Sequence, residues 1–206
     1  LSASSAAAQG LPPELVEKLS AATVYITLGA DEPESSGSGY LVRVDGDTGY
    51  VVTNHHVIEE FFEPAAGGKV KITAVFDSGA PKERSFPAEP VAIDKDHDLA
   101  VIRVTGVKDL PAPLDLSAPP KPFPTMPVWV CGYPFGGRLA GGTGKNPAVS
   151  IGGGNVSALR TNAHGDLGTV QLNGALNPGN SGGPVVAADG KLVGVAVRTI
   201  RNAGLG

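Results

Sequence analysis

The chain has 206 residues, a net charge of −4 and a hydrophobic content of 41%. This length suits one large β domain or two small ones that share an interface, and an acidic balance without a basic stripe argues against a nucleic-acid partner. The single cysteine, Cys131, excludes an internal disulfide, so a packed core must supply the stability. It lies in an apolar, strand-like run, which predicts a buried and unreactive thiol.

The start of the chain is rich in small residues. It begins with Leu1 rather than Met, and residues 2–8 have the composition expected after or beside a signal peptide. We therefore expect an extracytoplasmic protein, periplasmic or secreted, with residues 1–10 disordered. No stretch is long and apolar enough to span a membrane. Residues 11–20 predict a short helix, because prolines open the segment and its apolar residues recur at helical spacing.

Short runs rich in β-branched residues, separated by turn signals, predict strands through the first half of the chain. They cover residues 23–28, 37–44, 50–54, 69–77, 86–94 and 99–104. Residues 45–49 form a hairpin-type turn, and residues 55–62 predict one or two helical turns. About six such strands are typical of an all-β barrel, which we assign with its leading helix to residues 11–105.

The middle of the chain has a different composition. Residues 106–127 contain seven prolines, which central strands exclude, so we expect an extended crossing between two β units. A second series of predicted strands covers residues 128–131, 148–151, 155–159, 169–172, 185–188 and 192–197. This series predicts a second β unit over residues 128–206.

Three polar residues stand where strands end or turn, in the order His56, Asp98 and Ser181. A serine hydroxyl becomes a nucleophile when an imidazole takes its proton, and a carboxylate on the far ring nitrogen fixes the tautomer. The glycines around Ser181 leave backbone N–H groups bare, and Gly179, Asn180 and Ser181 are the candidate oxyanion hole. Taken alone, this glycine-rich stretch fits a simple hairpin turn equally well.

Three sequence blocks carry a resemblance to a known family. They are Thr-Asn-His-His-Val at 53–57, Asp-Leu-Ala-Val-Ile at 98–102 and Gly-Asn-Ser-Gly-Gly-Pro at 179–184. They resemble the signature blocks of trypsin-like serine proteases, and of the HtrA (Deg) branch in particular. The segments 37–40, 132–136, 154–159 and 190–195 agree with it. The resemblance implies two six-stranded antiparallel barrels with an active site in the cleft between them.

The resemblance also assigns the individual residues. His56 rather than His55 is the expected base, because Val57 follows it as in the motif, and Asp98 is preferred to Asp94 and Asp96 because it directly precedes an apolar strand. The chain stops where the family enters a last strand and a closing helix. The second barrel is therefore expected to be truncated, and a following PDZ domain is absent from this sequence.

The specificity pocket can be predicted in part from the same resemblance. Ala175, six residues before Ser181, stands where an enzyme specific for Arg or Lys would carry a carboxylate. Val197, Arg198 and Thr199 are expected to lie along the substrate and to pair with its backbone. These residues predict small or medium apolar side chains before the cleaved bond.

The sequence thus predicts a serine endopeptidase acting on unfolded or extended polypeptides. The alternatives are a protease-like fold that binds peptides or acts as a chaperone with little turnover, and a hydrolase of small esters. No cofactor is expected, and four histidines and one cysteine give no metal-binding spacing. A trimer is implied by the family resemblance alone.

Overall fold

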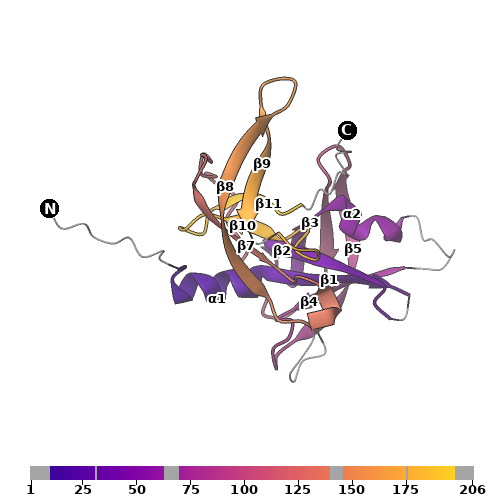
Figure 1. The fold of residues 1–206 in the computed structure, drawn as a ribbon. Coiled ribbons are helices and arrows are strands. Elements are labelled where there is room, and N and C mark those ends of the chain that lie inside the picture. The colour runs from indigo at the N-terminus through magenta and orange to yellow at the C-terminus, as the bar shows by residue number, and fades with distance from the viewer. Residues whose placement is uncertain (1–9, 31, 63–69, 140–145, 175, 198–206) are drawn as a thin grey trace.

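The computed structural model describes residues 10–30, 32–62, 70–139, 146–174 and 176–197. Figure 1 shows a short N-terminal helix and two groups of strands. The helical elements are α1 (Pro13–Ala22), α2 (His55–Ile58) and the 3-10 turns η1 (Glu59–Phe61) and η2 (Gly136–Leu139). The prediction of a mostly β fold with a leading helix is confirmed.

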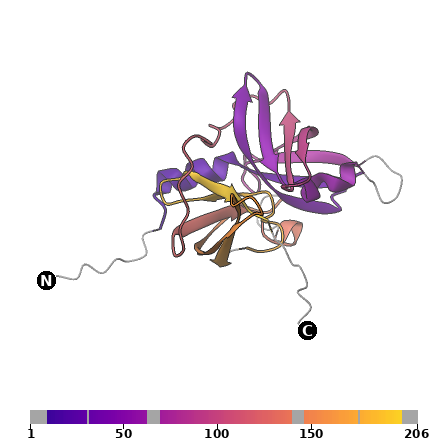
Figure 2. The same ribbon diagram turned by 90° about the horizontal axis from the view of Figure 1, so that it is seen from above.

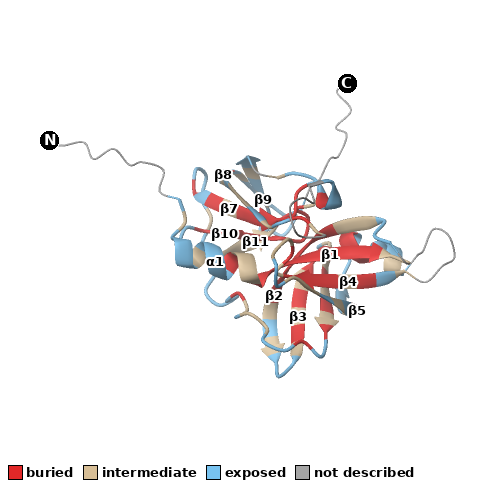
Figure 3. Cartoon of the chain, turned by 90° about the horizontal axis from the view of Figure 1, so that it is seen from below, coloured by how far each residue is buried: buried red, intermediate tan, exposed pale blue. Residues whose placement is uncertain are grey.

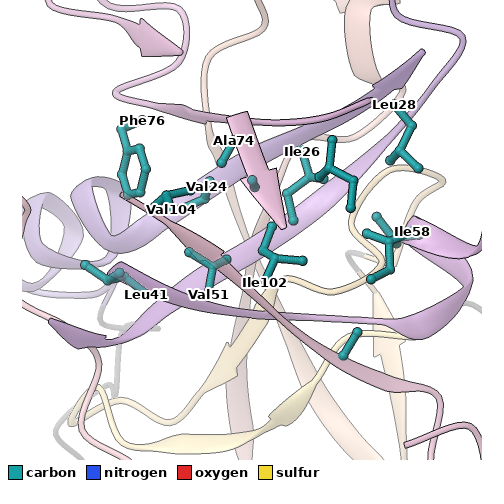
Figure 4. Close-up of a cluster of buried hydrophobic side chains, with 14 of the residues drawn as sticks. Val24, Ile26, Leu28, Leu41, Val51, Ile58, Ala74, Phe76, Ile102 and Val104 are labelled. Carbon is teal, nitrogen blue, oxygen red and sulfur yellow. The ribbon is translucent and has the colours of Figure 1, made fainter. Parts of the chain in front are cut away.

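The first group of strands is a closed antiparallel barrel in the order β1-β2-β3-β6-β5-β4. Its strands are β1 (Thr23–Gly29), β2 (Ser35–Asp45), β3 (Thr48–Thr53), β4 (Lys71–Phe76), β5 (Arg84–Asp94) and β6 (Leu99–Val104). Alternate residues of these strands point inward, as the two-residue period of a strand requires. They fill the barrel with aliphatic side chains and Phe76, as Figure 4 shows.

The second group is a five-stranded antiparallel sheet in the order β11-β10-β7-β8-β9. Its strands are β7 (Pro127–Gly132), β8 (Ser150–Thr161), β9 (Leu167–Gly174), β10 (Pro184–Val186) and β11 (Leu192–Val195). Its buried cluster is smaller than that of the barrel, and much of β8 and β9 is exposed, as Figure 3 shows. The described residues therefore form one closed barrel and one curled half-barrel.

A third apolar cluster joins the two units. It combines Leu19 of α1, Tyr40 of β2, Cys131 of β7 and Val186 of β10, all buried. The two units lie against each other along this cluster, and Figure 2 shows them from above with α1 beside both. Burial raises the pKa of the Tyr40 hydroxyl, and the expectation of a buried Cys131 is confirmed.

Two strands predicted at residues 148–151 and 155–159 are in fact one strand, β8, and that prediction was wrong. The glycines between them pair with β7, Gly152 with Val130 and Gly153 with Trp129. A Cβ added at Gly153 would lie 3.7 Å from the Trp129 ring nitrogen, which is an ordinary contact distance, so the indole lies beside this part of the strand. Strand pairing outweighed the weak intrinsic strand preference of glycine.

The longest helix of the described residues has ten residues, and none of their helices is long and apolar enough to cross a bilayer.

Candidate active site

His56 and Asp98 are brought together by the pairing of two barrel strands. Thr53 at the end of β3 pairs with Ala100 near the start of β6, so α2, which follows β3 and contains His56, begins beside Asp98, the residue before β6. The His56 Nδ1 atom lies 2.7 Å from Asp98 Oδ2. The His56 backbone N–H also donates to Asp98 Oδ1 at 2.9 Å. The carboxylate therefore fixes both the ring and the backbone of His56.

The backbone of Asp98 is held as firmly as its carboxylate. Its carbonyl accepts hydrogen bonds from the Asn54 side-chain amide at 2.8 Å and from the His55 N–H at 3.1 Å. Its φ of +55° lies in the left-handed region, which aspartate tolerates better than most residues. His55 itself stacks on Phe62, with the ring centroids 6.3 Å apart.

A second carboxylate–imidazole pair lies close by and provides a comparison. His97 Nδ1 is 2.8 Å from Asp94 Oδ2, and the His97 N–H donates to the other oxygen. These hydrogen bonds hold the pKa of the Asp94 carboxyl below its usual value. The side chains of Asp94 and His97 are 50% and 75% exposed, and neither lines the pocket that contains Ser181. Pair geometry alone therefore does not identify the site.

Ser181 lies in a turn in which most backbone N–H and C=O groups are hydrogen-bonded. The Pro178 carbonyl accepts a hydrogen bond from the Phe135 N–H, and the Gly179 carbonyl accepts one from the Ser38 hydroxyl. The Asn180 carbonyl accepts from the Gly183 N–H, and the Ser181 carbonyl accepts from the Ser38 N–H. The N–H groups of Asn180 and Gly182 donate to the carbonyls of Asn177 and Ala196. Gly179 and Gly182, with φ of +96° and +86°, allow the chain to turn this tightly.

Two N–H groups of this turn, those of Gly179 and Ser181, have no acceptor among the described residues. The N–H of Asn180, between them, is bound within the turn at 3.1 Å from Asn177 O. In a trans peptide the C=O and N–H point in opposite directions. The bonded carbonyls of Pro178 and Asn180 therefore turn the N–H groups of Gly179 and Ser181 away from those contacts. The N–H groups of Gly179 and Ser181, two positions apart and without an acceptor among the described residues, can bind a developing oxyanion.

His56 and Ser181 line the same pocket, with a volume of about 480 Å³. Its other lining residues are Ser35, Ser36, Val57, Glu60, Pro178 and Gly179. Glu60 accepts a hydrogen bond from Ser35. No hydrogen bond links the Ser181 hydroxyl to the His56 ring, both of which are described, and such bonds are often long before substrate binds. The pocket thus brings together the His56 ring, which Asp98 holds from behind, the Ser181 hydroxyl, and the N–H groups of Gly179 and Ser181, to which no described residue offers an acceptor.

The remaining predicted residues are only partly within the described part of the chain. Ala175, Arg198 and Thr199 lie outside it, while Val197 follows β11 with 37% of its surface exposed. Ser38 is a residue of this site to which the sequence assigned no role, although its Gly-Ser-Gly setting contributed to the resemblance. The described residues contain no cluster of three or more His, Cys, Asp or Glu suited to a metal.

Comparisons with known proteins agree with this geometry. The family model described as Trypsin-like peptidase domain matches residues 37–195. The chain is 34% identical over 199 residues to serine protease PepD of Mycobacterium tuberculosis, covering 91% of this chain and 40% of that protein. It is 31% identical over 189 residues to serine protease HTRA3 of Homo sapiens, covering 88% of this chain and 39% of that protein.

A third relative is named a probable periplasmic serine endoprotease, DegP-like, of Chlamydia pneumoniae. It is 32% identical over 180 residues, covering 84% of this chain and 32% of that protein. The chain thus spans less than half the length of these three relatives.

Among solved structures, the crystal structure of Deg5 superposes with a TM-score of 0.71 at 24% identity, covering 90% of this chain and 83% of that one. The serine endoprotease of Yersinia pestis gives 0.65 at 24% identity, covering 88% and 55%. These structures share the fold of one barrel packed against a second curled sheet. The chain belongs to the trypsin-like peptidase family and, within it, is similar to the HtrA proteases.

Proposed function

We propose that this chain is the peptidase unit of a serine endopeptidase. In this proposal Ser181 is the nucleophile, His56 the general base and Asp98 the carboxylate that orients the imidazole. The observation that carries the proposal is the pocket shared by His56 and Ser181, with Asp98 2.7 Å from the far ring nitrogen. In this proposal the groups that carry the reaction line the pocket or contact His56.

The proposed reaction begins with the peptide carbonyl over Ser181. His56 takes the hydroxyl proton as the oxygen attacks, and the carbonyl oxygen becomes an anion held by the N–H groups of Gly179 and Ser181. Collapse of this intermediate breaks the C–N bond, with His56 giving the proton to the leaving amine. A water molecule, deprotonated by His56, then attacks the acyl-enzyme ester, and the carboxylic acid leaves as Ser181 takes back its proton. Asn180 contributes to the hole through the shape of the turn, because its own N–H is engaged with Asn177.

The proposed substrates are unfolded or extended polypeptides with small or medium apolar residues before the cleaved bond. Ala175 and Val197, at the positions expected to form the specificity pocket, are uncharged, so no carboxylate from them is available to bind Arg or Lys; this supports the proposal. The names of the relatives, serine proteases in each case, support peptide-bond cleavage. The periplasmic relative supports an extracytoplasmic location. A preference for Arg-Xaa bonds in a peptide library would refute the specificity.

The test is covalent labelling with a fluorophosphonate probe. We expect the probe to modify Ser181, and we expect the label to be lost in Ser181→Ala and in His56→Ala. Labelling should also weaken in acid, because a protonated imidazole cannot accept the hydroxyl proton. A folded wild-type protein that stays unlabelled while still binding casein would instead support the peptide-binding alternative. Labelling with turnover of small esters but not casein would support an esterase.

A further inference from the structure

Ser38, in β2 of the barrel, uses every one of its polar groups in a hydrogen bond. Its N–H donates to Ser181 O at 2.8 Å, and its carbonyl accepts from Thr53 Oγ1 at 2.7 Å. Its hydroxyl donates to Gly179 O at 2.7 Å and accepts from Tyr133 N at 3.0 Å. The residue is completely buried. One side chain of the first unit thus fixes two segments of the second.

The end of β7 packs closely against this hydroxyl. A methyl group added at Gly132 would lie 2.8 Å from Ser38 Oγ, so the chain at the end of β7 passes directly against it. Loss of the hydroxyl would leave the part-buried Gly179 carbonyl and the buried Tyr133 N–H without this partner. Such groups are costly, and the chain relieves the cost by moving if it can.

We infer that the Ser38 hydroxyl is a positioning group for the oxyanion hole, an inference that rests on the proposed function. The Gly179 carbonyl and the Asn180 N–H belong to one peptide plane, held by Ser38 at one side and by Asn177 O at the other. The two free N–H groups, of Gly179 and Ser181, belong to the planes directly before and after it. Rotation of the middle plane would change the dihedral angles on both sides and turn the two donors.

Ser38 does not touch the reacting atoms and is therefore no catalytic residue. It acts by holding the turn in place, so its loss should weaken binding of the transition state, which lowers kcat, and leave substrate binding nearly unchanged. If Ser38 were merely structural, its replacement would lower stability and leave the chemistry of the folded enzyme unchanged. The two roles can be separated because the chain contains a matched serine, Ser78.

Ser78 has the same kind of contact at another place. It is also buried, and its hydroxyl donates at 2.7 Å to the carbonyl of Pro147, again from the barrel side to the second unit. It lies after β4, and it neither lines the pocket nor contacts the turn of Ser181. Ser78→Ala therefore removes an equivalent bond between the units without touching the oxyanion hole.

The experiment compares wild type, Ser38→Ala and Ser78→Ala on an apolar peptide substrate and on a peptide boronate, which forms a tetrahedral adduct with the nucleophile. We expect Ser38→Ala to lower kcat roughly 10- to 100-fold with KM changed by less than about twofold, because misplaced donors weaken the transition state alone. Boronate affinity should fall by a similar factor. Ser78→Ala should lose thermal stability and keep its kcat. Equal kcat values for both variants, with both folded, would overturn the inference.

Amide hydrogen exchange tests the role of Ser38 without measuring enzyme activity. In Ser38→Ala the Asn180 amide should exchange its hydrogen faster than in wild type, while Ser78→Ala should leave it unchanged. If wild type is not labelled at Ser181, the proposed function fails, and this exchange rate still tests Ser38: an unchanged rate refutes its role. Should Ser38→Ala not fold, Ser38→Cys fills the space with a weak donor and should show the same changes.

Discussion

The closed barrel and the five-stranded sheet hold their parts of the candidate site in different ways. In the barrel, His56 and Asp98 follow directly from the pairing of β3 with β6, and the strands stand on a continuous apolar core. In the sheet, the Ser181 turn is held by hydrogen bonds to Ser38, Phe135 and Ala196, which lie in other segments. The acid–base pair is thus built into one unit, whereas the nucleophile turn is held both by its own unit, through Phe135 and Ala196, and across the interface, through Ser38.

The largest effect that this comparison predicts is on the pair in the barrel. Asp98→Asn should lower kcat about 10⁴-fold, because the amide favours the wrong imidazole tautomer. Fold and stability should change little, since the backbone carbonyl of residue 98 keeps its two donors. Steady-state kinetics and circular dichroism measure the two outcomes.

Asp94→Asn is the control for this prediction. It removes a carboxylate with the same two contacts to a histidine, His97, outside the pocket. Its kcat should equal that of wild type. If Asp94→Asn were the more damaging change, the assignment of Asp98 would be wrong.

A smaller effect concerns the cores of the two units. Val51 in β3 and Val156 in β8 are both buried, and the same change, valine to alanine, can be made in each. We expect Val51→Ala to lower the free energy of unfolding by about 2–3 kcal/mol and Val156→Ala by about 1–2 kcal/mol, because an open sheet collapses around a lost side chain more easily than a closed barrel. Urea unfolding measures both. A larger loss at Val156 would contradict the picture of a firm barrel and a looser sheet.

The same contrast explains what could be predicted from the sequence. The barrel strands were found within a few residues of their true ends, because β-branched runs and turn signals act locally. His56 and Asp98 stand at strand ends that the sequence marks. The unbroken β8 was missed, since its central glycines, Gly152 and Gly153, are held extended by pairing with β7, which lies elsewhere in the chain. Ser38 was missed as a contact of the turn because its partners, Gly179 and Tyr133, lie far away in the chain.

The last effect is confined to alkaline pH and is expected at Cys131, where the two units meet. Burial raises the pKa of its thiol from 9.0 to about 12. The folded chain therefore holds this proton more tightly than the unfolded chain does. The stability gained is complete below about pH 9 and is lost as the pH rises toward 12. Cys131→Ala should flatten this alkaline fall in stability, whatever its effect at neutral pH.

The same thiol reports whether the two units separate before they unfold. Iodoacetamide should leave native Cys131 unmodified at pH 8, because the thiol is buried and protonated. Its cluster contains residues of α1, β2, β7 and β10, so exposure requires at least one of these elements to move away from the junction. We expect alkylation to follow the same urea transition as the loss of circular dichroism. Alkylation at lower urea than that transition would mean that the junction of α1, β2, β7 and β10 opens before the strands unfold, and that the region where the two units meet is less stable than either group of strands.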